Sequence, residues 1–137
     1  MKKVFIKIYG CQSNIADSEQ IAGILKNNYK IVDSIKEADI VIINTCSIKL
    51  RTQNKTLDFI KKIPRNKILI VGGCLPSSIN LRKYSDNIST LFNTNSILKL
   101  PIIIKNLKDE LPQEKEKRIN ILRIRKNRDT AIINIAE

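Results

Sequence analysis

The chain has 137 residues, of which 42% are hydrophobic, a length and composition that suit one globular domain with its own core. Its 25 Lys and Arg residues outnumber its 13 Asp and Glu residues, and the resulting net charge of +12 favours a polyanionic partner, although a proteome-wide bias toward Lys gives the same balance. The sequence contains no histidine, which excludes Ser-His-Asp and Cys-His catalysis within this chain.

Apolar runs rich in Ile and Val predict the strands of a buried parallel sheet. The first run begins at Val4, and the others cover residues 29–32, 39–44, 67–71 and 89–92. Because helical patterns separate the runs, we expect an α/β fold in which a parallel sheet of about five strands has helices on both faces.

The helical patterns have recognisable starts and inward faces. Asp17 or Ser18 is the candidate cap of the first helix. A second helix is expected to start at Ser47, and its inward face carries Leu57, Ile60 and Ile63. A last helix is expected over residues 96–107, where Pro101 either kinks the helix or opens a second segment.

All three cysteines of the chain, Cys11, Cys46 and Cys74, follow predicted strands. Strands of one parallel sheet end at the same edge, so we expect the three thiols to converge at the edge where open α/β sheets place their ligands. Gly10 and the pair Gly72-Gly73 directly precede two of the cysteines, where a missing Cβ lets backbone or ligand approach closely. The sequence therefore predicts a site at this edge.

Three thiols at one edge are compatible with several chemistries. The sequence has no apolar run of the roughly 18 to 20 residues that a membrane span needs and no signal peptide, so we expect a cytoplasmic chain with reduced thiols. Zinc normally takes four protein ligands, and its fourth would here be carboxylate or water. An iron-sulfur cluster held by three thiolates leaves one iron open. Alternatively, the cysteines are small buried hydrophobic residues at strand ends.

The pattern changes after residue 107. Residues 108–117 are polar and lack an apolar period, which predicts a linker. Residues 118–137 begin with alternating basic and apolar residues and end in a strand-like run, which suggests the start of another domain that is cut short. Basic residues in this segment are candidates for RNA binding, with a solvated linker as the alternative, namely Arg118, Arg123, Arg125, Lys126 and Arg128.

Three segments resemble one known family in their order and spacing. They are GCQSNIADSE at residues 10–19, ADIVIINTCSIK at 38–49 and VGGCLP at 71–76. Together they resemble the amino-terminal domain of the radical S-adenosylmethionine methylthiotransferases. The resemblance implies a flavodoxin-like domain over residues 1–107 and, within 118–137, the truncated start of the radical S-adenosylmethionine domain.

The resemblance also implies cofactors and partners. Cys11, Cys46 and Cys74 match the ligands of an auxiliary [4Fe-4S] cluster, while S-adenosylmethionine and a second [4Fe-4S] cluster belong to a domain that this sequence lacks. The expected partners are tRNA and the remaining radical S-adenosylmethionine and RNA-binding domains of the same chain, with no membrane, and the fragment alone is not expected to be catalytic. Candidate residues around the cluster ligands, for which capping or turn roles are equally open, are Gln12, Asn14, Asn44, Thr45 and Gly73.

Two segments suggest a substrate. NTCSIK at residues 44–49 and LRIRKN at 122–127 resemble the archaeal and eukaryotic branch of the family. That branch adds a methylthio group to C2 of N6-threonylcarbamoyladenosine next to the anticodon, so we expect this substrate rather than N6-isopentenyladenosine. The alternative function is a non-catalytic basic module that binds RNA or a partner protein and whose cysteines are structural.

Overall fold

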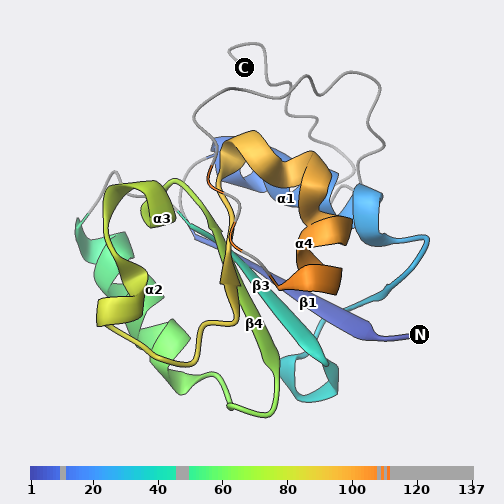
Figure 1. The fold of residues 1–137 in the computed structure, drawn as a ribbon, viewed down its shortest axis with the longest axis horizontal. Coiled ribbons are helices and arrows are strands. Elements are labelled where there is room, and N and C mark those ends of the chain that lie inside the picture. The colour runs from blue at the N-terminus through green and yellow to red at the C-terminus, as the bar shows by residue number, and fades with distance from the viewer. Residues whose placement is uncertain (10–11, 46–49, 108, 110, 112–137) are drawn as a thin grey trace.

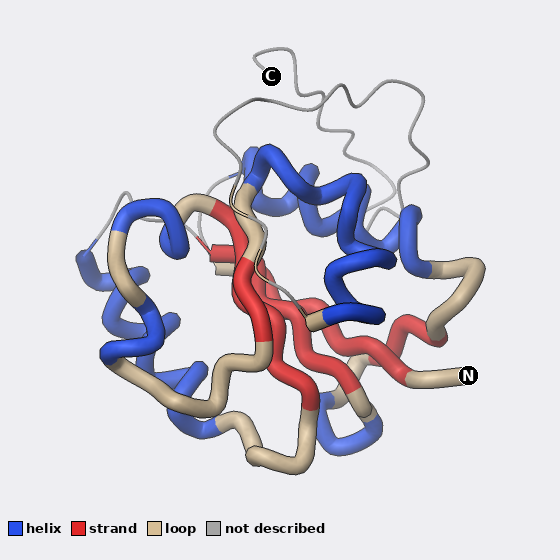
Figure 2. Tube along the Cα trace, in the orientation of Figure 1, coloured by secondary structure: helices blue, strands red, loops and turns tan. Residues whose placement is uncertain are grey.

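The structure is a computed structural model that describes residues 1–9, 12–45, 50–107, 109 and 111, without the side chains of residues 12–14 and 50–52. Figure 1 shows a parallel sheet with α1 and α4 on one side and α2 and α3 on the other. The strands form the middle layer of this arrangement in Figure 2. No helix of the described residues is long and apolar enough to cross a membrane.

The sheet has five parallel strands, as predicted, and their order is β2-β1-β3-β4-β5. Their bounds are β1 (Lys3–Ile8), β2 (Lys30–Val32), β3 (Ile40–Thr45), β4 (Ile68–Gly73) and β5 (Thr90–Leu91). The helices and 3-10 segments are α1 (Gln12–Leu25), η1 (Ile35–Glu37), α2 (Leu50–Lys62), α3 (Leu75–Ser78), η2 (Leu81–Lys83), η3 (Thr94–Lys99) and α4 (Leu100–Asn106). The α/β fold with helices on both faces is therefore confirmed.

Strand β3 lies at the centre of the sheet and is buried along its whole length. Its side chains alternate between two cores, because successive residues of a strand point to opposite faces. Ile40 and Ile42 join the core under α1 and α4, whereas Val41 and Ile43 join the core under α2. The predicted inward face is confirmed, because Leu57 and Ile60 of α2 and Ile63, which directly follows the helix, are buried in the second core.

The start of α1 differs from the prediction. The helix begins at Gln12, and the expected caps Asp17 and Ser18 lie inside it, 2% and 3% exposed. Capping rules assume that such polar side chains bond to their own helix end, but the Ser18 hydroxyl accepts a hydrogen bond from the Asn44 side chain of β3. A partner distant in sequence therefore displaces the local capping role.

Pro101 separates the last predicted helix into two segments. A 3-10 stretch, η3, ends at Lys99, and Pro101 occupies the first turn of α4. Proline is tolerated there because the first N–H groups of a helix have no partner within the helix. The sequence left open whether Pro101 kinks one helix or opens a second segment, and in the structure it opens a second segment.

Asp109 lies in the region predicted to be a linker, and it binds the domain. Its carboxylate accepts hydrogen bonds from the Arg82 guanidinium (3.0 Å for Nη2), from the Thr90 hydroxyl (3.1 Å) and from the Leu91 N–H (3.0 Å). The hydrogen bond from Arg82 is the main cause that lowers the pKa of Asp109 below its usual range. Asp109 therefore holds edge strand β5.

We expect Asp109→Asn to destabilise the domain at neutral pH by a few tenths to about 1 kcal/mol, because the ion pair with Arg82 is partly exposed. A lowered pKa contributes stability above the unfolded-state value and loses it as the pH falls through the folded-state value. The difference between variant and wild type should therefore shrink on acidification, which urea unfolding at several pH values measures. Asp86→Asn is the control, because the Asp86–Arg65 pair is 77% and 71% exposed; an equal effect there would contradict the role of Asp109.

Candidate functional site

The carboxyl ends of β1 and β3 adjoin at the point where the strand order reverses. From β1 the chain passes through α1 to β2 on one side of the sheet, and from β2 it crosses to β3 on the other side. Helices α1 and α2, which follow β1 and β3, cover opposite faces (Figure 1). Such a switch point leaves a crevice at the carboxyl edge, which is where open α/β sheets bind ligands.

Cys74 is the cysteine that lies within the described residues, and it is exposed at this edge. It follows β4 directly and precedes α3. Its N–H donates to the Thr45 carbonyl (3.2 Å), and its own carbonyl accepts a bond from the Ser78 hydroxyl (3.2 Å). The backbone that carries this thiol is therefore fixed beside Thr45, the residue that precedes Cys46 in the sequence.

Thr45 connects β3 to the turn that follows β4. Its side chain is fully buried, donates to the Gly72 carbonyl (2.5 Å) and accepts a hydrogen bond from the Leu75 N–H (3.2 Å). Because Leu75 opens α3, one hydroxyl holds both the end of a strand and the start of a helix. Thr45 thus fixes the backbone on either side of Cys74.

Asn44 connects β3 to its other neighbours. Its side-chain amide donates to the Ser18 hydroxyl of α1 (3.0 Å), and its backbone carbonyl accepts a hydrogen bond from the Tyr9 N–H directly after β1 (2.9 Å). The residue is 1% exposed, so both bonds are shielded from water. Sequence reasoning placed Asn44 near the site but missed Ser18, whose position predicted a helix cap.

Gly73 brings the backbone of β4 unusually close to that of β3. Its φ of +94° lies in the region that favours glycine, and a Cβ would lie 2.3 Å from the Thr45 carbonyl oxygen and 2.6 Å from the Asn44 side-chain oxygen. The predicted close approach at this glycine is therefore present. Asn44, Thr45 and Gly73, three of the residues expected around the cluster ligands, meet at one place.

Two aromatic rings lie near the end of β1. The rings of Tyr9 and Phe59 meet edge to face with centroids 5.8 Å apart, and the Lys7 ammonium lies 5.5 Å and 5.6 Å from the two centroids. Burial raises the pKa of Tyr9, which favours the neutral phenol. Sequence reasoning missed this pair, because Phe59 comes from α2, 50 residues further along the chain.

Several predicted site residues lie outside the described residues. Gln12 and Asn14 belong to the first turns of α1, but their side chains are not described. Residues predicted as ligands or as RNA contacts that lie wholly outside are Cys11, Cys46, Arg118, Arg123, Arg125, Lys126 and Arg128. Convergence of the three thiols therefore stays a prediction.

The three thiols predicted for this edge would suit an iron-sulfur cluster. Within the described residues no three Cys, Asp or Glu residues form a metal-binding group, and two of the three cysteines are outside that part of the chain. The described thiol is exposed. The strand that precedes Cys46, β3, is the direct neighbour of β4, and the strand that precedes Cys11, β1, lies on the other side of β3. A set of thiols without imidazole suits iron-sulfur clusters better than a closed four-ligand zinc site.

The fold and this edge define an α/β domain with a cysteine-bearing switch point, and comparison with known sequences gives its family. Residues 3–93 match the family described as Uncharacterized protein family UPF0004, and the chain belongs to that family.

Named relatives are tRNA-2-methylthio-N(6)-dimethylallyladenosine synthases. The chain is 37% identical over 116 positions to the enzyme of that name from Baumannia cicadellinicola subsp. Homalodisca coagulata. This alignment covers 77% of the present chain and 26% of the relative. The chain is 36% identical over 134 positions to that of Aquifex aeolicus, covering 85% and 30% respectively. The chain thus spans about a quarter to a third of these relatives. Their names agree with the resemblance to methylthiotransferases but do not support the threonylcarbamoyladenosine branch.

We expect Thr45→Val to destabilise the domain by about 1 to 3 kcal/mol, because the buried Leu75 N–H and Gly72 carbonyl lose a hydrogen-bond partner without a change of side-chain volume. Thr45→Ser keeps the hydroxyl and should recover most of this loss. Denaturant unfolding of the three proteins measures both effects. A loss in Thr45→Ser with none in Thr45→Val would mean that the methyl group, and not the hydroxyl, is what this position needs.

Proposed function

We propose that this chain is the cluster-carrying domain of a tRNA methylthiotransferase, in which Cys11, Cys46 and Cys74 hold an auxiliary [4Fe-4S] cluster. The observation that carries the proposal is the bond between the Cys74 N–H and the Thr45 carbonyl, which sets the exposed thiol beside the residue preceding Cys46. Family membership and the names of the relatives support the same conclusion. Residues 108–117 would then connect this domain to the next one.

The residues at the edge would hold and orient the ligands. Such a cluster, held by three thiolates, supplies one iron with an open coordination position for a sulfur donor. Thr45 and Asn44 would keep the ligand-bearing backbone in place through their buried hydrogen bonds, and Gly73 would let the neighbouring backbones approach. The Tyr9 and Phe59 rings would restrict water on the side of α2. The domain would thus position sulfur, while S-adenosylmethionine and the second cluster belong to the rest of the protein.

The substrate that we propose is an N6-modified adenosine next to the anticodon of tRNA, methylthiolated at C2. The sequence resemblance favours N6-threonylcarbamoyladenosine, whereas the names of the relatives specify dimethylallyladenosine. Expressing the complete protein in a host without its own methylthiotransferases, followed by mass spectrometry of tRNA nucleosides, separates the two. Whichever N6 group carries the new methylthio group is the substrate, and the absence of both products would contradict the proposal.

Cluster binding is tested on the chain itself. Anaerobic reconstitution with iron and sulfide should give visible iron-sulfur absorption and the Mössbauer spectrum of a [4Fe-4S] cluster with about one cluster per chain. A colourless protein after reconstitution would instead favour the alternative, a basic module that binds RNA or a partner and whose cysteines are structural. The net charge of +12 is the observation in favour of that alternative.

A further inference from the structure

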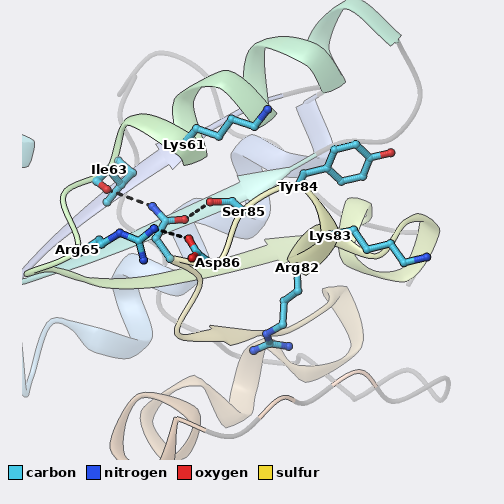
Figure 3. Close-up of a pocket in the computed structure, with 9 residues that line it drawn as sticks. Lys61, Ile63, Arg65, Arg82, Lys83, Tyr84, Ser85 and Asp86 are labelled. Atoms are coloured by element: carbon cyan, nitrogen blue, oxygen red, sulfur yellow. Dashed lines mark hydrogen bonds and ion pairs between the residues drawn. The ribbon is translucent and has the colours of Figure 1, made fainter.

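A polar hollow of about 410 Å³ lies between the end of α2 and the segment that follows η2. Its lining includes Lys61 and Arg65 from the end of α2 and the turn after it, and Lys83, Tyr84, Asp86 and Asn87 from the other side (Figure 3). We call this feature the basic hollow. It is separate from the carboxyl edge, because α2 starts after β3 and ends before the start of β4, at the opposite edge of the sheet.

The floor of the basic hollow is held in place by Asn87. The side-chain amide of Asn87 donates to the carbonyls of Ile60 (2.9 Å) and Ile63 (3.1 Å), which are the last carbonyls of α2 and the turn after it. Its side-chain oxygen accepts a bond from the Ser85 hydroxyl. These bonds fix residues 84–87 against the helix end, so the hollow exists before any ligand binds.

Some positive side chains of the basic hollow are paired with carboxylates and others are not. Arg65 pairs with Asp86, and Arg82 pairs with Asp109. Within the described residues the ammonium groups of Lys61 and Lys83 have no such partner, and both residues are exposed. Two positive charges therefore remain available to an anionic ligand.

Tyr84 adds an exposed aromatic ring beside these charges. The residue is 49% exposed, one of the large hydrophobic residues that the domain leaves in water. In Figure 3 the side chains of Tyr84 and Lys83 extend to the same side, away from the Arg65–Asp86 pair. A ring next to free ammonium groups is the combination by which proteins bind single-stranded nucleic acid, because bases stack on the ring and phosphates contact the cations.

We propose that the basic hollow binds the sugar-phosphate backbone of tRNA through Lys61 and Lys83, with an unpaired base stacked on Tyr84. That the RNA is tRNA rests on the proposed function. Helix α2 has 13 residues and is therefore about 20 Å long, so the hollow and the cysteine edge lie roughly that far apart. An RNA that contacts both would be held at two points, and the hollow would orient the strand that enters the site.

The test is fluorescence anisotropy of a labelled, unmodified tRNA transcript titrated with the chain at several salt concentrations. Lys61→Ala/Lys83→Ala should reduce the slope of log affinity against log salt by roughly 1.4 to 1.8, the value for two lost phosphate contacts. Tyr84→Ala should weaken binding roughly fivefold to a hundredfold, and Tyr84→Phe should restore it to within about twofold. Lys30→Ala/Lys36→Ala is the matched control, because it removes two exposed lysines that lie in edge strand β2 and in η1, which follows it.

Each outcome decides between the two proposals. If the control pair lowers the salt slope as much as the Lys61/Lys83 pair, RNA binding follows net charge and the basic hollow is not a site. If inorganic phosphate binds to the wild type more tightly than to the Lys61/Lys83 variant while the two proteins bind RNA equally well, the hollow is a free-anion site and the proposal is overturned. If the wild type and the variants all carry a cluster but none of them binds RNA, the proposal for the hollow is overturned and the proposed function stays intact. Hollow-dependent binding by a chain without a cluster would do the reverse. Thermal melting by circular dichroism confirms that the variants are folded.

Discussion

Cys74→Ala is expected to lose the [4Fe-4S] cluster after reconstitution, with the iron and sulfide content falling from about one cluster per chain to a small residue. The proposed ligand set has three thiolates and no histidine to replace one of them. Removing one ligand leaves two iron atoms of the cluster without a protein ligand, and such clusters are exposed to solvent and decay. Cys11→Ala and Cys46→Ala should behave in the same way. Iron and sulfide analysis together with Mössbauer spectroscopy measures the loss.

Ser78→Ala is the control for this prediction. It removes the hydroxyl that donates to the Cys74 carbonyl but leaves the thiol in place. The variant should keep its cluster, because that hydrogen bond is exposed and contributes little. If Cys74→Ala retains full cluster content while its melting temperature equals that of the wild type, Cys74 is not a ligand, and the site at this edge must be assigned differently.

Gly73→Ala is expected to destabilise the domain by about 3 kcal/mol or more, which is a large part of the stability of an ordinary domain. Two costs add here. Alanine is strained at a φ of +94°, and its Cβ would lie 2.3 Å from the Thr45 carbonyl oxygen and 2.7 Å from the Thr45 nitrogen. Both atoms belong to the backbone of β3, so no side chain can move to make room. Urea unfolding measures the change in the free energy of unfolding.

Gly72→Ala provides the contrast. Its Cβ would lie 2.0 Å from the ring of Phe92, a side chain in the core under α1 and α4. A second substitution, Phe92→Leu, shortens this side chain and should recover part of the loss in the double variant, with a coupling of about 1 kcal/mol or more. No such recovery is expected when Phe92→Leu is combined with Gly73→Ala. Full recovery of Gly73→Ala by that change would show that the clash at Gly73 is not with the backbone.

The fold could be predicted because the signals for it are local. The run at residues 39–44, for example, carries apolar residues on both faces at positions 40–43, which indicates a central parallel strand, and helical patterns lie between the runs. The start of α1 could not be predicted, because Ser18 has a partner in β3, 26 residues away. The same holds for Asp109, whose hydrogen bonds to Arg82, Thr90 and Leu91 span 18 to 27 residues.

The site was predictable to the extent that it follows strand ends. Asn44, Thr45 and Gly73 meet because β3 and β4 end at the same edge, a consequence of parallel pairing. The basic hollow left no sequence signal. Its floor depends on Asn87, and an asparagine in a polar loop has the same appearance whether it caps a distant helix or faces water.

The strand order also determines how the domain can assemble during synthesis. After β1 and β2 have paired, β3 adds to the free side of β1, β4 adds to β3, and β5 adds to β4. Strands therefore join one moving front in the order in which they leave the ribosome, and the first of these pairs, Val4 with Ile40, closes a loop of 36 residues. Until β5 is made, the open front is β4, a six-residue strand that is buried in the finished domain and whose outward-facing backbone groups would then lack partners. We therefore expect nascent chains that stop before residue 90 to aggregate, and longer chains, whose edges are strands of three and two residues, to stay in solution.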